Sequence, residues 1–130
     1  MNPFEKASAT VSSGLRAQAY RLQVVSENLA NADTHGYRRK LVSFDNVYDS
    51  TMGGDIVQVG RVTLDSSPPA EVFDPNHPLA NESGYVTTSN VNIMTEFADA
   101  REASRSYEAG LQVFRQVRDM YASLLDILKR

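Results

Sequence analysis

Histidine and cysteine, which often bind metals and take part in catalysis, are scarce in this chain. Its 130 residues include two histidines and no cysteine. Asp33 stands two residues before His35 and Asp74 three before His77, but pairs of this kind are common by chance. A metal centre needs three or four such ligands close together. We therefore predict no metal site.

Other polar residues form no known catalytic or cofactor-binding motif. Ser12 and Ser13 do not lie in a nucleophile elbow. Gly53 and Gly54 lack the spacing of a phosphate-binding glycine loop, so we expect an ordinary loop there. The absence of cysteine removes thiol nucleophiles, thiolate zinc sites and disulfides together. We predict that the chain is not an enzyme and binds no cofactor.

Charge and hydropathy exclude further classes. The net charge is -3, whereas a nucleic-acid-binding protein usually has a basic face. The densest basic run, Arg-Arg-Lys at 38–40, is short, and we expect it at a solvated edge between a turn and a strand. No stretch approaches the eighteen or so apolar residues of a membrane span, and residues 1–18 lack the apolar core of a signal peptide. We expect no nucleic acid, membrane span or cleaved signal.

The chain contains two long helical patterns, and residues 1–32 form the first. Leucines recur every seven residues at 15, 22 and 29, and a second row contains Val11, Gln18, Val25 and Ala32. Two such rows make a coiled-coil-like seam. Pro3 suits the first turn of a helix. We expect the helix to end near residues 31–33, before the turn at 34–36.

Residues 91–130 carry the stronger helical pattern. One row of seven-residue spacing is Ile93, Ala100, Tyr107, Phe114, Tyr121 and Leu128, and its companion is Ala103, Gly110, Val117 and Leu124. Asn90 or Asn92 could cap the start. At about 1.5 Å per residue, this helix would be about 55 Å long. The rest of the chain is too small to cover it.

The segment between the helices, residues 33–90, contains four of the five prolines and predicts a small β-rich insert. The best strand candidate is 55–64, as a strand or hairpin arm, with shorter candidates at 40–44, 70–73 and 85–88. The predicted fold class is therefore mainly α with a small β-rich insert, the two terminal helices packing as a coiled-coil-like layer. Isolated helices are marginal in water, so we expect the helical ends to become fully ordered only on assembly.

Residues 28–38, Asn-Leu-Ala-Asn-Ala-Asp-Thr-His-Gly-Tyr-Arg, resemble the N-terminal signature of the flagellar rod, hook and hook-associated protein family. Residues 77–86, 90–92 and 103–109 resemble one short branch of it, the proximal rod protein C family. The similarly short proximal rod protein B family lacks the Gly-Tyr-Val segment found here at 84–86. One departure is His35, where the wider family often has proline.

The resemblance implies a structural subunit of the proximal rod of the bacterial flagellum, with no catalytic role. It implies helical polymerisation with itself and other rod proteins, in the periplasm above the MS ring and export gate. It also implies export by the flagellar type III apparatus without a cleaved signal. The alternative is a helix-capturing adaptor of a secretion system. The predicted assembly interface comprises Val11, Leu15, Leu22, Val25, Asn28, Leu29, Asn31, Gly36, Tyr37, Tyr107, Phe114, Val117, Tyr121, Leu124 and Leu128.

Overall fold

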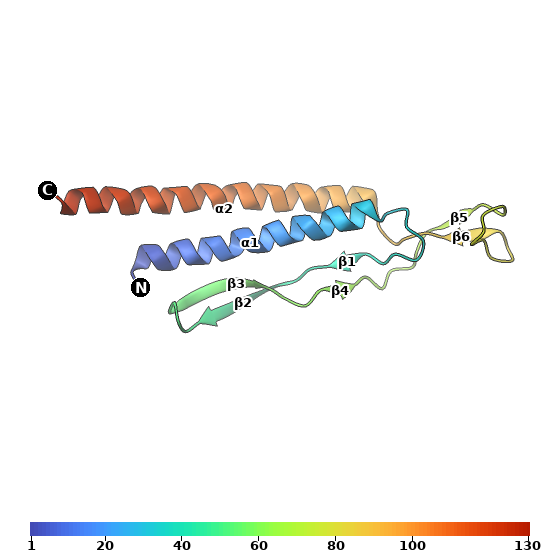
Figure 1. The fold of residues 1–130 in the computed structure, drawn as a ribbon, viewed down its shortest axis with the longest axis horizontal. Coiled ribbons are helices and arrows are strands. Elements are labelled where there is room, and N and C mark those ends of the chain that lie inside the picture. Colours follow the sequence, from blue (N-terminus) through green and yellow to red (C-terminus); the bar gives the residue numbers. More distant parts are fainter.

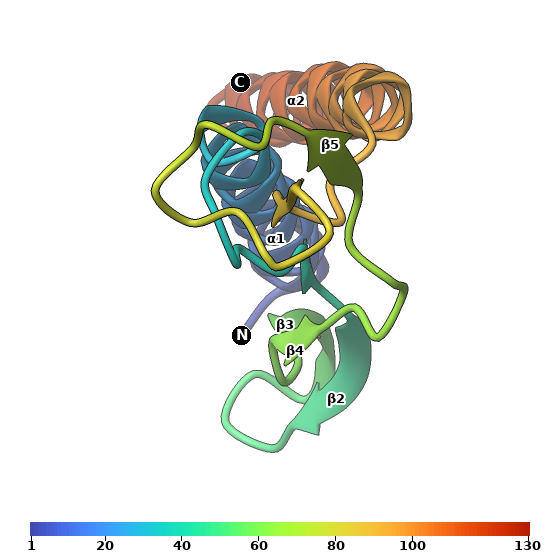
Figure 2. The ribbon, with the colours of Figure 1, turned by 90° about the vertical axis from the view of Figure 1, so that its right-hand side faces the viewer.

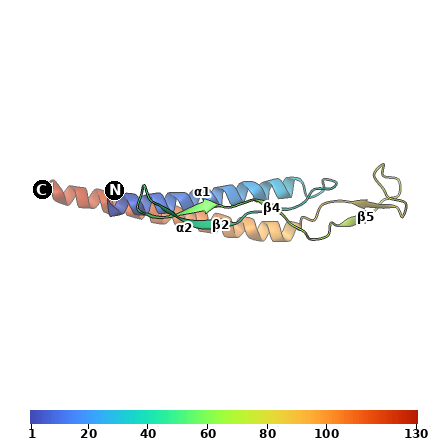
Figure 3. The ribbon, with the colours of Figure 1, turned by 90° about the horizontal axis from the view of Figure 1, so that it is seen from below.

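Two long antiparallel helices form the body of the molecule in a computed structural model that describes all 130 residues. Helix α1 spans Pro3–Ala30 and helix α2 spans Ile93–Leu128. They lie side by side, and the segment between them carries six short strands (Figure 1, Figure 3). This confirms the predicted fold class, mainly α with a small β-rich insert.

Both helices begin at an asparagine cap. The Asn2 side chain accepts a hydrogen bond from the backbone of Glu5 at 2.8 Å, and the Glu5 carboxylate accepts one from the Asn2 N–H at 3.1 Å. This reciprocal capping box satisfies two groups that a helix start leaves unpaired. At α2, the Asn92 side chain accepts from Met94 and Thr95. Of the two candidates for that cap, Asn92 is the one used.

The seam between the helices is narrow and has small residues at its centre. Ala17 of α1 and Ala103 of α2 are buried, and Leu15 lies against Gly110. At the far end of the seam the rings of Phe4 and Tyr121 pack with centroids 5.4 Å apart. Only 10 of 130 residues are buried, so most apolar side chains of this chain keep a surface that another molecule could cover.

The insert consists of three separate two-stranded antiparallel ribbons. They pair β1 (Lys40–Leu41) with β4 (Thr63–Leu64), β2 (Phe44–Asp49) with β3 (Gly54–Val59), and β5 (Glu71–Phe73) with β6 (Tyr85–Thr87). The segment predicted at 55–64 is divided between β3 and β4. The division falls at Gly60, whose N–H donates to the Ser43 carbonyl at 2.8 Å and where a Cβ would lie 2.5 Å from Ser43 Oγ.

Helix α1 lies between α2 and the β2–β3 hairpin (Figure 2). The hairpin attaches through polar groups of α1: Thr10 Oγ1 donates to the Asp55 carbonyl at 2.8 Å, and Ser13 Oγ accepts from Val57 N–H at 2.9 Å. The β5–β6 hairpin instead projects beyond the ends of both helices (Figure 1). The helices and the β2–β3 hairpin therefore form one elongated body, with β5–β6 at its tip.

Candidate functional site

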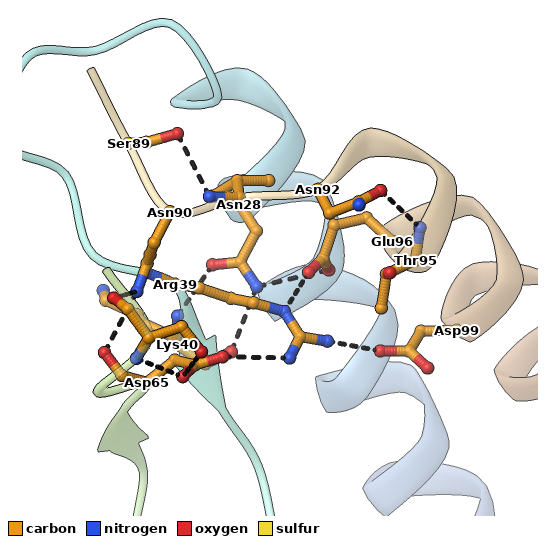
Figure 4. Close-up of polar contacts among 12 residues, drawn as sticks. Asn28, Arg39, Lys40, Asp65, Ser89, Asn90, Asn92, Thr95, Glu96 and Asp99 are labelled. Atoms are coloured by element: carbon orange, nitrogen blue, oxygen red, sulfur yellow. Dashed lines mark hydrogen bonds and ion pairs between the residues drawn. The ribbon is translucent and has the colours of Figure 1, made fainter. Parts of the chain in front are cut away.

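A cluster of charged and amide side chains joins the end of α1, the start of α2 and the strands between them. We call this cluster the polar junction; its members are Asn28, Arg39, Lys40, Asp65, Asn90, Glu96 and Asp99 (Figure 4). Glu96 at its centre is fully buried. Arg39 Nε donates to one carboxylate oxygen of Glu96, and Asn28 Nδ2 donates to the other at 3.3 Å. The buried charge is thus paired and hydrogen-bonded, as a buried charge must be.

The Arg39 guanidinium contacts three acidic residues that come from distant parts of the chain. Besides Glu96, its Nη2 donates to Asp99 Oδ2 at 2.8 Å, and its Nη1 lies 3.5 Å from Asp65 Oδ2. Burial opposes the positive charge, but the hydrogen bond and charge of Glu96, helped by Asp99 and Asp65, outweigh it and raise the pKa of Arg39. Arg39 therefore stays charged and links α2 to the segment that follows β4.

The Asp65 carboxylate also accepts hydrogen bonds within its own turn. The hydroxyl and backbone N–H of Ser67 both donate to its carboxylate, and they are the main reason that the pKa of Asp65 is lowered; Arg39 adds to the effect. Asn90 Nδ2 donates to the Asp65 carbonyl at 3.0 Å, while Asn90 Oδ1 accepts from the Arg39 N–H. The junction therefore fixes backbone as well as side chains.

Asn28 is the second buried member of the junction. Its Oδ1 accepts from Lys40 N–H at 3.0 Å and from the Tyr37 hydroxyl at 2.9 Å, and its Nδ2 also donates to the Lys40 carbonyl at 3.0 Å. Burial, followed by the charge of Glu27, raises the pKa of Tyr37. The turn that brings Tyr37 back onto α1 passes through Gly36, whose φ of 73° favours glycine.

Asn31 ends α1, as its side chain donates to the Glu27 carbonyl at 2.9 Å. Together with Asn28, Gly36 and Tyr37, it belongs to the predicted assembly interface, yet all four act here on their own chain. Their contacts close the end of the helix and return the chain toward β1. Any role in contacts between subunits stays a prediction for these four residues.

The apolar members of the predicted interface differ in how far this chain already covers them. Val25 is buried, and Leu15 and Tyr121 pack against Gly110 and Phe4. Others are half-buried along the helices: Val11, Leu22, Leu29, Tyr107, Phe114 and Val117. Leu124 and Leu128 are exposed, the latter at 73%. Coverage thus falls off toward the C-terminal end of α2.

Sequence reasoning missed the centre of the polar junction. It placed residues 38–40 at a solvated edge, which is wrong for Arg39, whose side chain is only 16% exposed. The available signal was Glu96 and Asp99, three residues apart and so on one face of the predicted helix. Nothing local paired that face with an arginine 57 positions away.

The structure groups no three histidines, aspartates or glutamates in a way that could hold a metal ion. Neither helix combines the length and apolar character that crossing a membrane requires.

Comparisons with known proteins identify the family. Residues 9–38 match the family model "Flagella basal body rod protein", and residues 82–127 match "Flagellar basal body rod FlgEFG protein C-terminal". The flagellar basal-body rod protein FlgC of Agrobacterium fabrum is 46% identical, over 99% of this chain and 98% of its own length. The FlgC proteins of Salmonella typhimurium and Bacillus subtilis are each 37% identical, over 88% and 90% of this chain and 90% and 93% of their own lengths. This chain belongs to the FlgC family of flagellar basal-body rod proteins.

Proposed function

We propose that this chain is a non-catalytic structural subunit of the proximal flagellar rod that polymerises helically through its paired terminal helices. The observation that carries the proposal is the apolar seam of α2, which continues past the point where α1 begins. Phe4 in the first turn of α1 packs on Tyr121, and Leu128 stands one seven-residue step further along the same row. Leu128 therefore lies in the seam but has no helix opposite it.

The surface at this end of α2 is large enough for another helix. An open groove there is lined by apolar side chains of Phe4, Met120, Leu124 and Ile127 among polar ones. Met120 and Ile127 are exposed, as are Leu124 and Leu128. Contiguous exposed apolar side chains mark interaction sites more often than chance exposure does. A neighbouring subunit that laid a helix in this groove would extend the seam between chains.

The names of the relatives support the place of assembly. We infer that the neighbours are other rod proteins, both proximal and distal, together with the adaptor region at the MS ring and export gate. The tube that these subunits form would transmit torque from motor to hook and conduct exported proteins. The thin core and the absence of cysteine suit a chain that crosses the flagellar type III apparatus unfolded and folds in the periplasm.

The adaptor alternative draws no support from the relatives, and one experiment separates it from the proposal. A strain lacking the endogenous copy is complemented with a tagged chain, and basal bodies are isolated and probed for the tag. We expect the chain to co-purify with the rod after the membrane rings have been removed, and swimming to be restored. Recovery only in the soluble or export-apparatus fraction would contradict a rod subunit.

A further inference from the structure

The β5–β6 hairpin (71–87) projects from the tip of the molecule and exposes apolar side chains that nothing in this chain covers. It has no substantial packing against either helix. Phe73 and Tyr85 lie opposite each other in the ladder and share one face, where their exposed rings pack edge-on at 5.3 Å. Val72 on the other face and Leu79 in the connecting loop are also exposed. A two-stranded hairpin is marginally stable alone in water. Covering the Phe73–Tyr85 face in an assembly would stabilise the hairpin.

All charged residues of this hairpin are acidic. Between Arg61 and Arg101 the sequence contains six acidic residues and no lysine or arginine. Three of the six, Asp65, Glu96 and Asp99, are paired with Arg39 in the polar junction. The other three lie on the hairpin, exposed and without an ion pair: Glu71, Asp74 and Glu82. A partner for this face should therefore be apolar with basic groups beside it.

One surface of the chain combines exposed apolar side chains with basic ones. The first turns of α2 carry Met94, Phe97, Arg101 and Arg105, which we call the arginine patch; at a spacing of three to four residues they share one helix face. Met94 is 76% and Phe97 56% exposed. The four side chains line a shallow groove with Ala98 and Glu102. Neither arginine forms an ion pair within the chain, and the opposite face of α2, with Ala103, meets α1.

We propose that the β5–β6 hairpin of one copy docks on the arginine patch of a second copy of this chain. Phe73 and Tyr85 would cover Met94 and Phe97, and the hairpin carboxylates would pair with Arg101 and Arg105. Within one chain the hairpin extends away from α2 along the long axis, so it does not reach its own patch (Figure 1). A contact between two different surfaces repeats from copy to copy and builds an open assembly. The inference rests on the proposed polymerising function and names one of its contacts.

Cysteine cross-linking tests this contact in cells, because the chain has no cysteine of its own. Two differently tagged chains are co-expressed, one carrying Ser83→Cys at the hairpin tip and the other Ala98→Cys in the patch. After mild oxidation of isolated basal bodies, we expect a dimer that carries both tags. Failure of that dimer to form, when both chains are present in the basal bodies, overturns the inference but leaves the rod function intact. Absence of both chains from basal bodies overturns the function itself.

The identity of the cross-linked partner also tests whether the hairpin docks on a second copy of this chain. A product in which Ser83→Cys joins a different basal-body protein, or another Ser83→Cys chain, in place of Ala98→Cys overturns docking on the patch of a second copy. Matched chains with Ser26→Cys, exposed on α1, in place of Ala98→Cys should give less than a tenth of the product.

Charge reversal provides an independent test. Asp74→Arg with Glu82→Arg, or Arg101→Glu with Arg105→Glu, should each lower the swimming rate several-fold. All four changes in one chain should restore at least half of the parental rate. The matched control combines the hairpin changes with Arg16→Glu and Arg61→Glu, which gives the same net charge at exposed positions outside the patch and the α2 groove. Normal swimming of either reversed pair, or equal rescue by the control, overturns the inference. Thermal melting of the purified chains shows which variants fold. For a variant that does not fold, the cysteine cross-link replaces swimming as the test of the contact.

Discussion

Arg39 and Glu96 stand 57 positions apart in the chain, and the guanidinium of Arg39 hydrogen-bonds to the fully buried carboxylate of Glu96. This contact joins the end of α1 to the start of α2, at the base of the projecting β5–β6 hairpin (Figure 4). Because Asp65 and Asp99 share the same guanidinium, the geometry of the insert is coupled to the pairing of the helices.

Removing the arginine should cost more than removing both members of the pair. Arg39→Ala leaves a buried carboxylate without its cation, and we expect it to lower the free energy of unfolding by about 3–5 kcal/mol. Arg39→Met with Glu96→Leu replaces the pair by apolar groups and should recover most of that loss. Urea denaturation measures both. Arg16→Ala, exposed on α1, is the control and should change stability by less than about 0.5 kcal/mol. An equally small loss for Arg39→Ala would contradict a stabilising junction.

Stability should fall in acid partly through Asp65. The hydrogen bonds from Ser67, with Arg39, lower the folded-state pKa of Asp65 below its ordinary 3.8. Its contribution is therefore present above that ordinary value and is lost as the pH falls through the folded-state pKa. Asp65→Asn should reduce the steepness of the loss of stability below pH 4, measured by thermal melting over a pH series. Asp45→Asn, exposed on β2, is the matched control. Identical acid profiles for Asp65→Asn and the parent would refute this assignment.

Ser13 should hold the β2–β3 hairpin on α1. Its buried hydroxyl accepts from Val57 N–H and donates to the Thr10 carbonyl at 2.6 Å. Ser13→Ala leaves that N–H without its partner, which should cost about 1–3 kcal/mol. Amide exchange at Val57 should accelerate while exchange in the middle of α2 does not. Ser12→Ala, one residue away, removes a hydroxyl that makes no such bond and should leave Val57 unchanged.

Substituting two helical glycines, Gly110 and Gly14, should change the stability in opposite directions. A Cβ at Gly110 would lie 3.0 Å from Leu15 Cδ2, so Gly110→Leu forces the helices apart and should cost about 1–3 kcal/mol. Gly14 has nothing within 4 Å of such a Cβ, and Gly14→Ala should gain about 1 kcal/mol from helix propensity alone. Thermal melts of the two variants beside the parent measure the difference. Equal effects would mean that Gly110 is not a close contact.

The uncovered end of α2 should matter for assembly and not for folding. Leu128→Asp places a charge where this chain has no opposing helix, so monomer stability should change by less than about 0.5 kcal/mol. In the rod the same charge would be buried unpaired, and swimming should be lost. Lys129→Asp adds a negative charge on a different face and should still swim. Leu22→Asp and Phe114→Asp should also block assembly, but both side chains are half-buried within the chain and so report on folding as well.

Sequence by itself determined the two helices, the class of the insert and the family. The seven-residue rows ending in Leu29 and Leu128 are local in the chain, and so is the turn at Gly36 and Tyr37. Local periodicity and turn chemistry follow from backbone geometry, which is why they can be recognised before any contact is known.

Only the tertiary structure decided which distant groups meet. The β2–β3 hairpin attaches to α1 through Ser13 and Thr10, two ordinary helix residues in the sequence. Glu96 is buried, although an acidic residue in the first turn of a helix is usually exposed. A carboxylate is stable there only because folding brings Arg39 and Asn28 to it, and such a pairing has no local period to reveal it.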